Sequence, residues 1–196
     1  MQNEMKKRAR EATRVLRILA QILFWLCVAG AGVCAAGGIV LLFVPGDFLQ
    51  GMPGGRLSIE LGDMLVYRLH EGLSFQDMLP LYRVSSFVIS VCFLAGVFFI
   101  HQMAQLLKAV EEGRPFTPDN AKRLTIMGLI LIAFSIVYRI GMFLILQTTL
   151  NLAPIPEMDV TLSLDMNGIF VGVLVLVLAA IFRYGSYLQD EYDATV

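Results

Sequence analysis

Two histidines and three cysteines are the residues of this sequence whose types most often carry metal or redox chemistry. Histidines on facing helices ligate haem, and cysteine with histidine binds zinc. His101 lies near one end of an apolar run, and His70 precedes the opposite end, so the two do not form a pair. Cys27, Cys34 and Cys92 all lie inside apolar runs, where cysteine is typically a small buried hydrophobe. The sequence also lacks a nucleophile–base pair and a phosphate loop, so we expect no cofactor, no metal and no enzymatic activity.

Arg139, in the stretch SIVYRIGMF, is the one charge well inside an apolar run. A charge within the membrane is costly and is by default a hypothesis for a functional site. Arg139 follows Arg123 by roughly 16 residues, about 24 Å of helix, which places it in the outer part of a membrane. From there its side chain can reach the headgroups or the acids Glu157 and Asp165. A structural ion pair and a ligand or gating role both remain open.

Four long apolar runs have to position these residues. The chain is 57% hydrophobic and 16% charged, whereas soluble domains carry about a quarter charged residues. Each run is long enough to cross a bilayer, and backbone in lipid must form its own hydrogen bonds, so helices are predicted. We therefore expect residues 1–196 to form a single all-α membrane domain. Its four transmembrane helices would cover about 18–44, 84–107, 124–150 and 168–188.

The basic residues of the chain predict its orientation. Six Lys and Arg residues precede the first run, and Lys108, Arg114, Lys122 and Arg123 lie in the elbow 108–123. The loop 151–167 has no basic residue, and the loop 45–83 is mainly acidic. Because basic loops stay in the cytoplasm, both termini and the elbow are predicted to be cytoplasmic, with the two acidic loops outside.

The two outer loops contain short alternating stretches. In RLSIEL (56–61) and DVTLSLD (159–165), apolar and polar residues alternate with period two, which is typical of half-buried strands. The two strands could pair across the helix ends, where packing would support an otherwise marginal ribbon. The fold prediction therefore includes a small two-stranded β cap made from both extracytoplasmic loops.

The residues of the elbow predict the end of one helix followed by the start of the next. Gly113 suits the left-handed residue that ends a helix, and Pro118 suits the first helical position. Thr117 is a good N-cap, and Asp119 meets the positive end of the helix dipole. This chemistry needs no function beyond joining two helices.

Two further features leave alternatives open. Small residues four apart, Gly32 with Ala36 and Gly168 with Gly172, favour close helix approach, either within the chain or in a homo-oligomer. The C-terminal stretch 184–196 has three tyrosines among Asp and Glu residues. Such a tail suits docking on a basic protein surface, and it equally suits a solvated helix end.

Two motifs together resemble a known family. The stretches LLKAVEEGRPFTPDNAKRLTIMG and AAIFRYGSYLQDEYDATV resemble those of the DUF2975 family, small bacterial membrane proteins with four spans. The chain departs from the family pattern at Ala194, where leucine is expected. The resemblance implies a bacterial origin and the inner, cytoplasmic membrane. The family-like positions are Gly113, Pro115, Phe116 and Asn120 in the elbow, and Phe182, Gly185, Leu188, Glu191, Asp193, Thr195 and Val196 in the tail.

The resemblance also suggests a regulatory or sensing role beside a small cytoplasmic helix-turn-helix regulator. The chain would bind the lipid bilayer and this DNA-binding protein, with no direct contact to nucleic acid. The alternative is a small transporter or channel subunit, acting as an oligomer. The residues expected to bind the partner are Gly113, Pro115, Phe116, Asn120, Leu188, Glu191 and Asp193.

Overall fold

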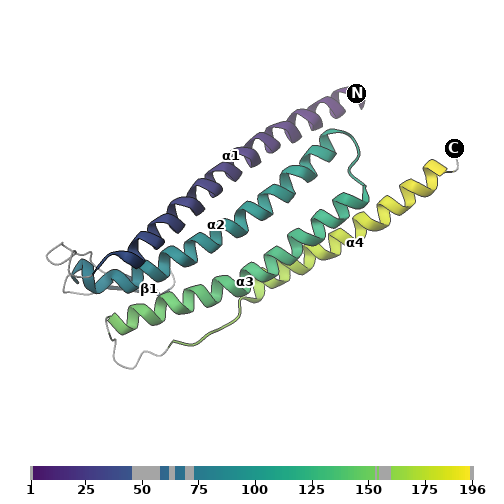
Figure 1. The fold of residues 1–196 in the computed structure, drawn as a ribbon. Helices are drawn as coiled ribbons and strands as arrows, with labels where there is room; N and C mark the ends of the chain where they lie inside the picture. The colour runs from purple at the N-terminus through teal and green to yellow at the C-terminus, as the bar shows by residue number, and fades with distance from the viewer. Residues whose placement is uncertain are drawn as a thin grey trace. The chain divides into compact units, whose positions relative to one another are not determined.

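The computed structural model describes residues 2–45, 58–61, 65–68, 73–152, 154 and 160–194. Within these ranges the chain forms four long helices and one β-hairpin (Figure 1). Each helix is long and apolar enough to cross a membrane, which confirms the four predicted spans and makes this a multi-pass membrane protein. The helices are α1 (Gln2–Phe43), α2 (Phe75–Glu111), α3 (Pro118–Leu152) and α4 (Met166–Ala194).

Helices α2, α3 and α4 extend beyond their apolar runs at both ends, and α1 does so at its N-terminal end. Polar side chains cap the first turns of α2 and α4. Ser74 precedes α2 and forms a reciprocal capping box with Asp77, in which the Asp77 amide donates to Ser74 Oγ at 3.2 Å. Asp165 precedes α4 and accepts a hydrogen bond from the Asn167 amide at 3.2 Å. These two helices therefore begin where a side chain can accept hydrogen bonds from the free amides of the first turn, and not where the apolar run begins.

The chain divides into two compact units. The first comprises Met1–Ala31, Val91–Tyr138 and Leu164–Val196, and the second comprises Gly32–Ser90 and Arg139–Ser163. The first unit contains segments of all four helices, the elbow between α2 and α3, and both chain ends. The second contains the hairpin and the ends of α1, α2 and α3.

The α3–α4 contact in the first unit depends on glycine. A Cβ at Gly172 would lie 2.5 Å from Cγ1 of Ile132 and 3.0 Å from the carbonyl oxygen of Gly128. Gly168 packs as closely against Ser135. The Gly168–Gly172 pair therefore serves packing within the chain, because the missing side chains let the two backbones approach. Beside it lies a core of Leu124, Met127 and Ala179, covered by Phe99, Met103, Leu106, Val175 and Phe182.

In the second unit, α1 and α2 are joined by a hydrogen bond from Arg83 Nε to the carbonyl oxygen of Leu41, at 2.8 Å. This guanidinium satisfies one of the carbonyls that the last turn of α1 leaves free. By contrast, a Cβ at Gly32 would meet nothing within 4 Å, and Ala36 is exposed. Among the described residues, Gly32 therefore makes no close helix contact that would require a glycine.

The prediction of a β cap built from both outer loops is wrong. Strand β1 (Ser58–Leu61) forms where alternation predicted it, but it pairs with β2 (Leu65–Arg68) of the same loop. The pairing is antiparallel, with Ser58 opposite Arg68 and Leu61 opposite Leu65. Residues 160–165 form no strand. A partner a few residues away is favoured because closing a short loop costs less chain entropy than joining two distant loops.

Candidate functional site

The elbow between α2 and α3 begins with a tightly closed helix end. Gly113 has a φ of +79°, as predicted for a left-handed residue. Its amide donates to the carbonyl of Val110, and the Arg114 amide donates to the carbonyl of Ala109, at 3.1 and 3.0 Å. These are the two bonds of a Schellman motif, which satisfies carbonyls that the last turn would otherwise leave free.

Asn120 is the most deeply buried polar residue of the elbow, with 2% of its surface exposed. Its Nδ2 atom donates to the carbonyl of Pro115 at 2.9 Å and reaches the carbonyl of Arg114 at 3.4 Å. Its own amide bonds the N-cap Thr117, through the carbonyl oxygen at 3.0 Å and Oγ1 at 3.3 Å. The Thr117 cap is therefore confirmed, and Asn120 holds the loop from inside.

Phe116 brings the elbow motif to the tail motif. Its ring lies 5.0 Å from the ring of Phe182 on α4, centroid to centroid. A Cβ at Gly185 would lie 3.0 Å from Cδ1 of Phe116, so glycine leaves the space that the ring occupies. Residues of the two motifs, far apart in sequence, thus form one packed contact in the first unit. Phe116 still keeps 42% of its surface exposed.

Beyond this contact the end of α4 presents large side chains to its surroundings. Tyr184, Tyr187 and Leu188 are 65%, 62% and 47% exposed. Glu191 is exposed as well, while the side chain of Asp193 lies outside the described residues, as do Thr195 and Val196. The expected partner-binding residues therefore separate into two groups. Gly113, Pro115 and Asn120 build the elbow, and Phe116, Leu188 and Glu191 offer exposed surface.

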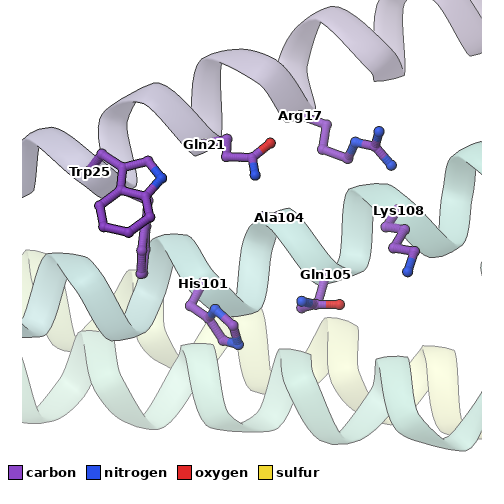
Figure 2. A pocket seen from close by; sticks show the side chains of 8 residues that line it. Arg17, Gln21, Trp25, His101, Ala104, Gln105 and Lys108 are labelled. Carbon is purple, nitrogen blue, oxygen red and sulfur yellow. The ribbon is translucent and has the colours of Figure 1, made fainter. Parts of the chain in front are cut away.

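A groove between α1 and α2 is a feature that the sequence did not single out. It has a volume of about 370 Å³, and Figure 2 shows the side chains that line it. Phe24 of α1 contacts His101 of α2 here, with ring centroids 6.0 Å apart. The signal that could have found it is spacing, since polar residues recur one turn apart on both helices. The lining residues are Arg17, Gln21, Phe24, Trp25, His101, Ala104, Gln105 and Lys108.

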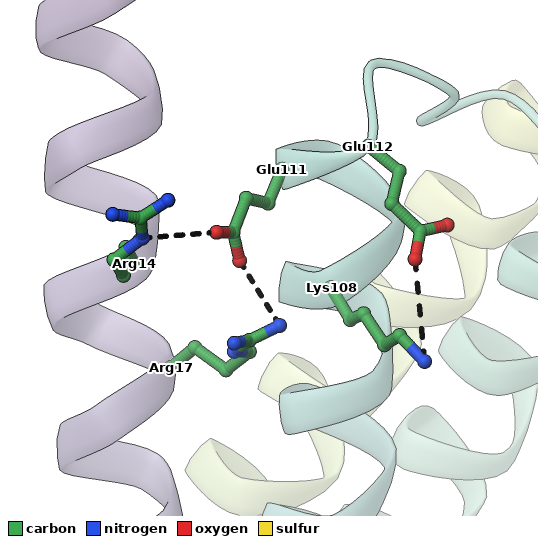
Figure 3. A network of polar contacts seen from close by, with 5 residues as sticks. All are labelled: Arg14, Arg17, Lys108, Glu111 and Glu112. Carbon is green, nitrogen blue, oxygen red and sulfur yellow. Dashed lines mark hydrogen bonds and ion pairs between the residues drawn. The ribbon is translucent and has the colours of Figure 1, made fainter.

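A network of ion pairs lies next to the groove, at the elbow end of α2 (Figure 3). Glu111 of α2 meets two arginines of α1: Arg14 Nε lies 3.2 Å from Oε1, and Arg17 lies 3.0 Å from Oε2. Glu111 is 16% exposed in its side chain, and Arg17 approaches Oε2 without the geometry of a hydrogen bond. Glu112 lies 4.0 Å from Lys108 and 3.7 Å from Arg114, where both partners are exposed and the pairs are weak.

The other candidate residues stay apart. Arg139 is half-buried in the second unit and forms no ion pair within the described part of the chain, while Glu157 and His70 lie outside it. The three cysteines are free thiols. Across the described ranges no group of three His, Cys, Asp or Glu residues is placed to hold a metal ion.

Comparison with known proteins identifies the family. Residues 73–196 match the family described as "Protein of unknown function (DUF2975)". No curated protein and no solved structure matches the chain. The matched region covers α2, α3 and α4, and it contains both the elbow and the α4 residues that the elbow contacts. The match covers more than half of the residues of this chain, and the chain therefore belongs to the DUF2975 family.

Proposed function

We propose that this chain is a non-enzymatic protein of the bacterial inner membrane, with its termini and elbow in the cytoplasm. The basic residues before α1 and in the elbow support this orientation, because basic segments are retained on the cytoplasmic side. The presence of both chain ends and the elbow in one compact unit agrees with it. A green fluorescent protein fused to the C-terminus should fluoresce, whereas alkaline phosphatase fused there should be inactive. The opposite pair of results would reverse the orientation.

Its role, in this proposal, is to hold a small cytoplasmic helix-turn-helix regulator at the membrane. The observation that carries the proposal is a patch, here called the tail patch, formed by Phe116, Tyr184, Tyr187 and Leu188. Phe116 covers Gly185, and Leu188 lies one turn further along α4, so these exposed side chains are neighbours. Tyrosine, together with tryptophan and arginine, is enriched among the residues that contribute most of the binding energy of protein interfaces.

Charge supports a basic partner. Asp190, Glu191 and Asp193 follow the tail patch in the sequence, and a DNA-binding protein presents positive charge. A change in the packing of α3 on α4 would alter the tail patch through Phe116 and Phe182. A signal that favours one packing would then shift the affinity for the regulator.

The test is an affinity pull-down from native membranes in a mild detergent, followed by mass spectrometry. We expect a small DNA-binding protein to co-purify with the wild type and to be lost with the double variant Tyr187→Ala, Leu188→Ala. The matched control is Phe170→Ala, Leu174→Ala on the same helix, because these residues are 63% and 51% exposed but lie away from the elbow. The control should retain the regulator.

A tyrosine belt at the lipid interface would leave these side chains equally exposed. The pull-down separates the two explanations, because belt residues bind lipid and retain no protein. If only the chain itself and lipid are recovered, or if the tail-patch variant retains the regulator, the proposal fails.

The transport alternative has less support. Two of the buried polar side chains of α3 bond their own helix: Ser135 Oγ donates to the carbonyl of Leu131 at 2.9 Å, and Thr149 Oγ1 donates to that of Ile145 at 2.8 Å. The donor of each of these hydroxyls is therefore already used within α3. Flux of small ions or solutes across vesicles containing the purified protein would favour this alternative over the regulatory one.

A further inference from the structure

The groove between α1 and α2 has an ordered lining. On α1 the lining runs from Arg17 through Gln21 to Trp25. Each step is about one helical turn, and the total rise is about 12 Å. Figure 2 shows Arg17 and Gln21 directed from α1 toward α2. The lining of α1 therefore changes from a cation to an amide to an aromatic ring along the groove.

The α2 residues that line the groove repeat this order. Lys108 is followed toward the N-terminus by Gln105 and then His101, over seven residues or about 10 Å. The two helices are antiparallel here, since Glu111 meets Arg14 and Arg17 while His101 meets Phe24. As a result the two cations lie at one level, the two amides at the next, and the rings at the third.

The cationic level lies where lipid headgroups would be. Arg17 immediately precedes the first apolar run, and Lys108 immediately follows the second. Around them, the network of Figure 3 and its neighbour Arg114 contain four cations, Arg14, Arg17, Lys108 and Arg114, but only two carboxylates, Glu111 and Glu112. This leaves the network with a net charge of +2, and two of its cations, Arg17 and Lys108, line the groove. An anion there would meet attraction that the protein's own carboxylates do not cancel.

We infer that this groove binds one anionic glycerophospholipid. The phosphate lies between Arg17 and Lys108, the glycerol esters lie at the level of Gln21 and Gln105, and an acyl chain passes Trp25. The order of the lining matches the order of chemical groups in such a lipid, from charged to polar to apolar. Basic pockets between transmembrane helices recognise anionic headgroups through the same contacts.

The chain carries its own reporter, because Trp25 is its only tryptophan and is 63% exposed in the groove. The full chain is reconstituted into vesicles of zwitterionic phosphatidylcholine with brominated acyl chains, which quench tryptophan fluorescence. Unbrominated anionic phosphatidylglycerol is then added in increasing proportion. Each cation contributes roughly 1 kcal/mol near a membrane surface, which is about fivefold in binding. Fluorescence of the wild type should therefore recover at a clearly lower fraction of phosphatidylglycerol than of unbrominated phosphatidylcholine.

In Lys108→Gln, the fraction of phosphatidylglycerol needed for fluorescence recovery should rise about fivefold. The double variant with Arg17→Gln should lose the preference for phosphatidylglycerol over phosphatidylcholine. The matched control is Arg14→Gln, which removes the other partner of Glu111 but does not line the groove. It lowers the charge of the network but removes no group that lines the groove, so its recovery should shift by clearly less than that of Lys108→Gln. Lys108 has only a weak exposed pair, so its variant should fold even if the Arg17 variant does not.

Three results would overturn the inference. Equal recovery with both lipids in the wild type would remove any anionic preference. An equal shift in Arg14→Gln and Lys108→Gln would assign the preference to general surface charge instead of the groove. Competition by millimolar inorganic phosphate would show that the site takes a free anion and not a lipid.

Discussion

Asn120→Ala should loosen the elbow more than any other single side-chain truncation in it. The variant removes a 2.9 Å hydrogen bond to the Pro115 carbonyl and a weaker 3.4 Å contact to that of Arg114. Asn120 is 2% exposed, so water does not readily replace the lost donor. A buried acceptor left without a partner costs about 1 to 3 kcal/mol, and we expect a loss of this size in the free energy of unfolding.

Two measurements on the protein in detergent micelles test this. Titration with sodium dodecyl sulfate, followed by far-ultraviolet circular dichroism, gives the change in unfolding free energy. Hydrogen exchange of the amides in residues 113–121 gives the local effect. If opening of the elbow governs exchange, a loss of about 1 to 3 kcal/mol speeds it roughly 5- to 150-fold.

The matched control is Asn151→Ala, another asparagine of α3 whose side chain is exposed. It should change the unfolding free energy by less than about 0.5 kcal/mol and leave exchange in the elbow unaltered. The reasoning would be refuted if Asn120→Ala exchanged in the elbow no faster than the wild type.

Three further substitutions test the packing. Gly172→Ala should lower the free energy of unfolding by about 1 to 3 kcal/mol, because the new Cβ would lie 2.5 Å from Ile132 of α3. Gly32→Ala should leave it unchanged, since nothing lies within 4 Å of that position. Equal effects of the two variants in the same denaturant titration would contradict the close α3–α4 contact. Gly113→Ala should cost about 1 kcal/mol from its φ of +79° alone, and an unchanged melting temperature would argue against that conformation. At low salt, Glu111→Gln should lower the melting temperature by more than Glu112→Gln does. The difference between the two variants should shrink in high salt, because salt screens ion pairs. A salt-independent effect would rule out ion pairing.

The membrane-spanning helices and their caps follow from the sequence by itself. Lipid offers the backbone no hydrogen bonds, so an apolar run of about 20 residues has only the helix available. The Gly113 helix end and the Thr117 cap are also local, because each depends on the conformational preference of one residue and the amides next to it. Such features need no knowledge of the rest of the chain.

Partner choice for the strand was the point at which sequence reasoning failed. Alternation predicted β1, but alternation carries no information about which segment pairs with it. The stretch LVYR at 65–68 is rich in strand-forming residues without alternating, so the period-two signal passed over it. The nearer partner formed the hairpin, for reasons of chain entropy.

Only the tertiary structure decided which side chains of different helices meet. The sequence marked Phe116, Phe182 and Gly185 separately, and the fold joined them into one contact. Likewise Arg17 and Lys108 are ordinary flanking cations in the sequence, and they line one groove only because α1 and α2 run antiparallel at matching heights. The physical reason is that helix formation is determined by local bonding, whereas the register between helices depends on how side chains far apart in the sequence fill the space between them.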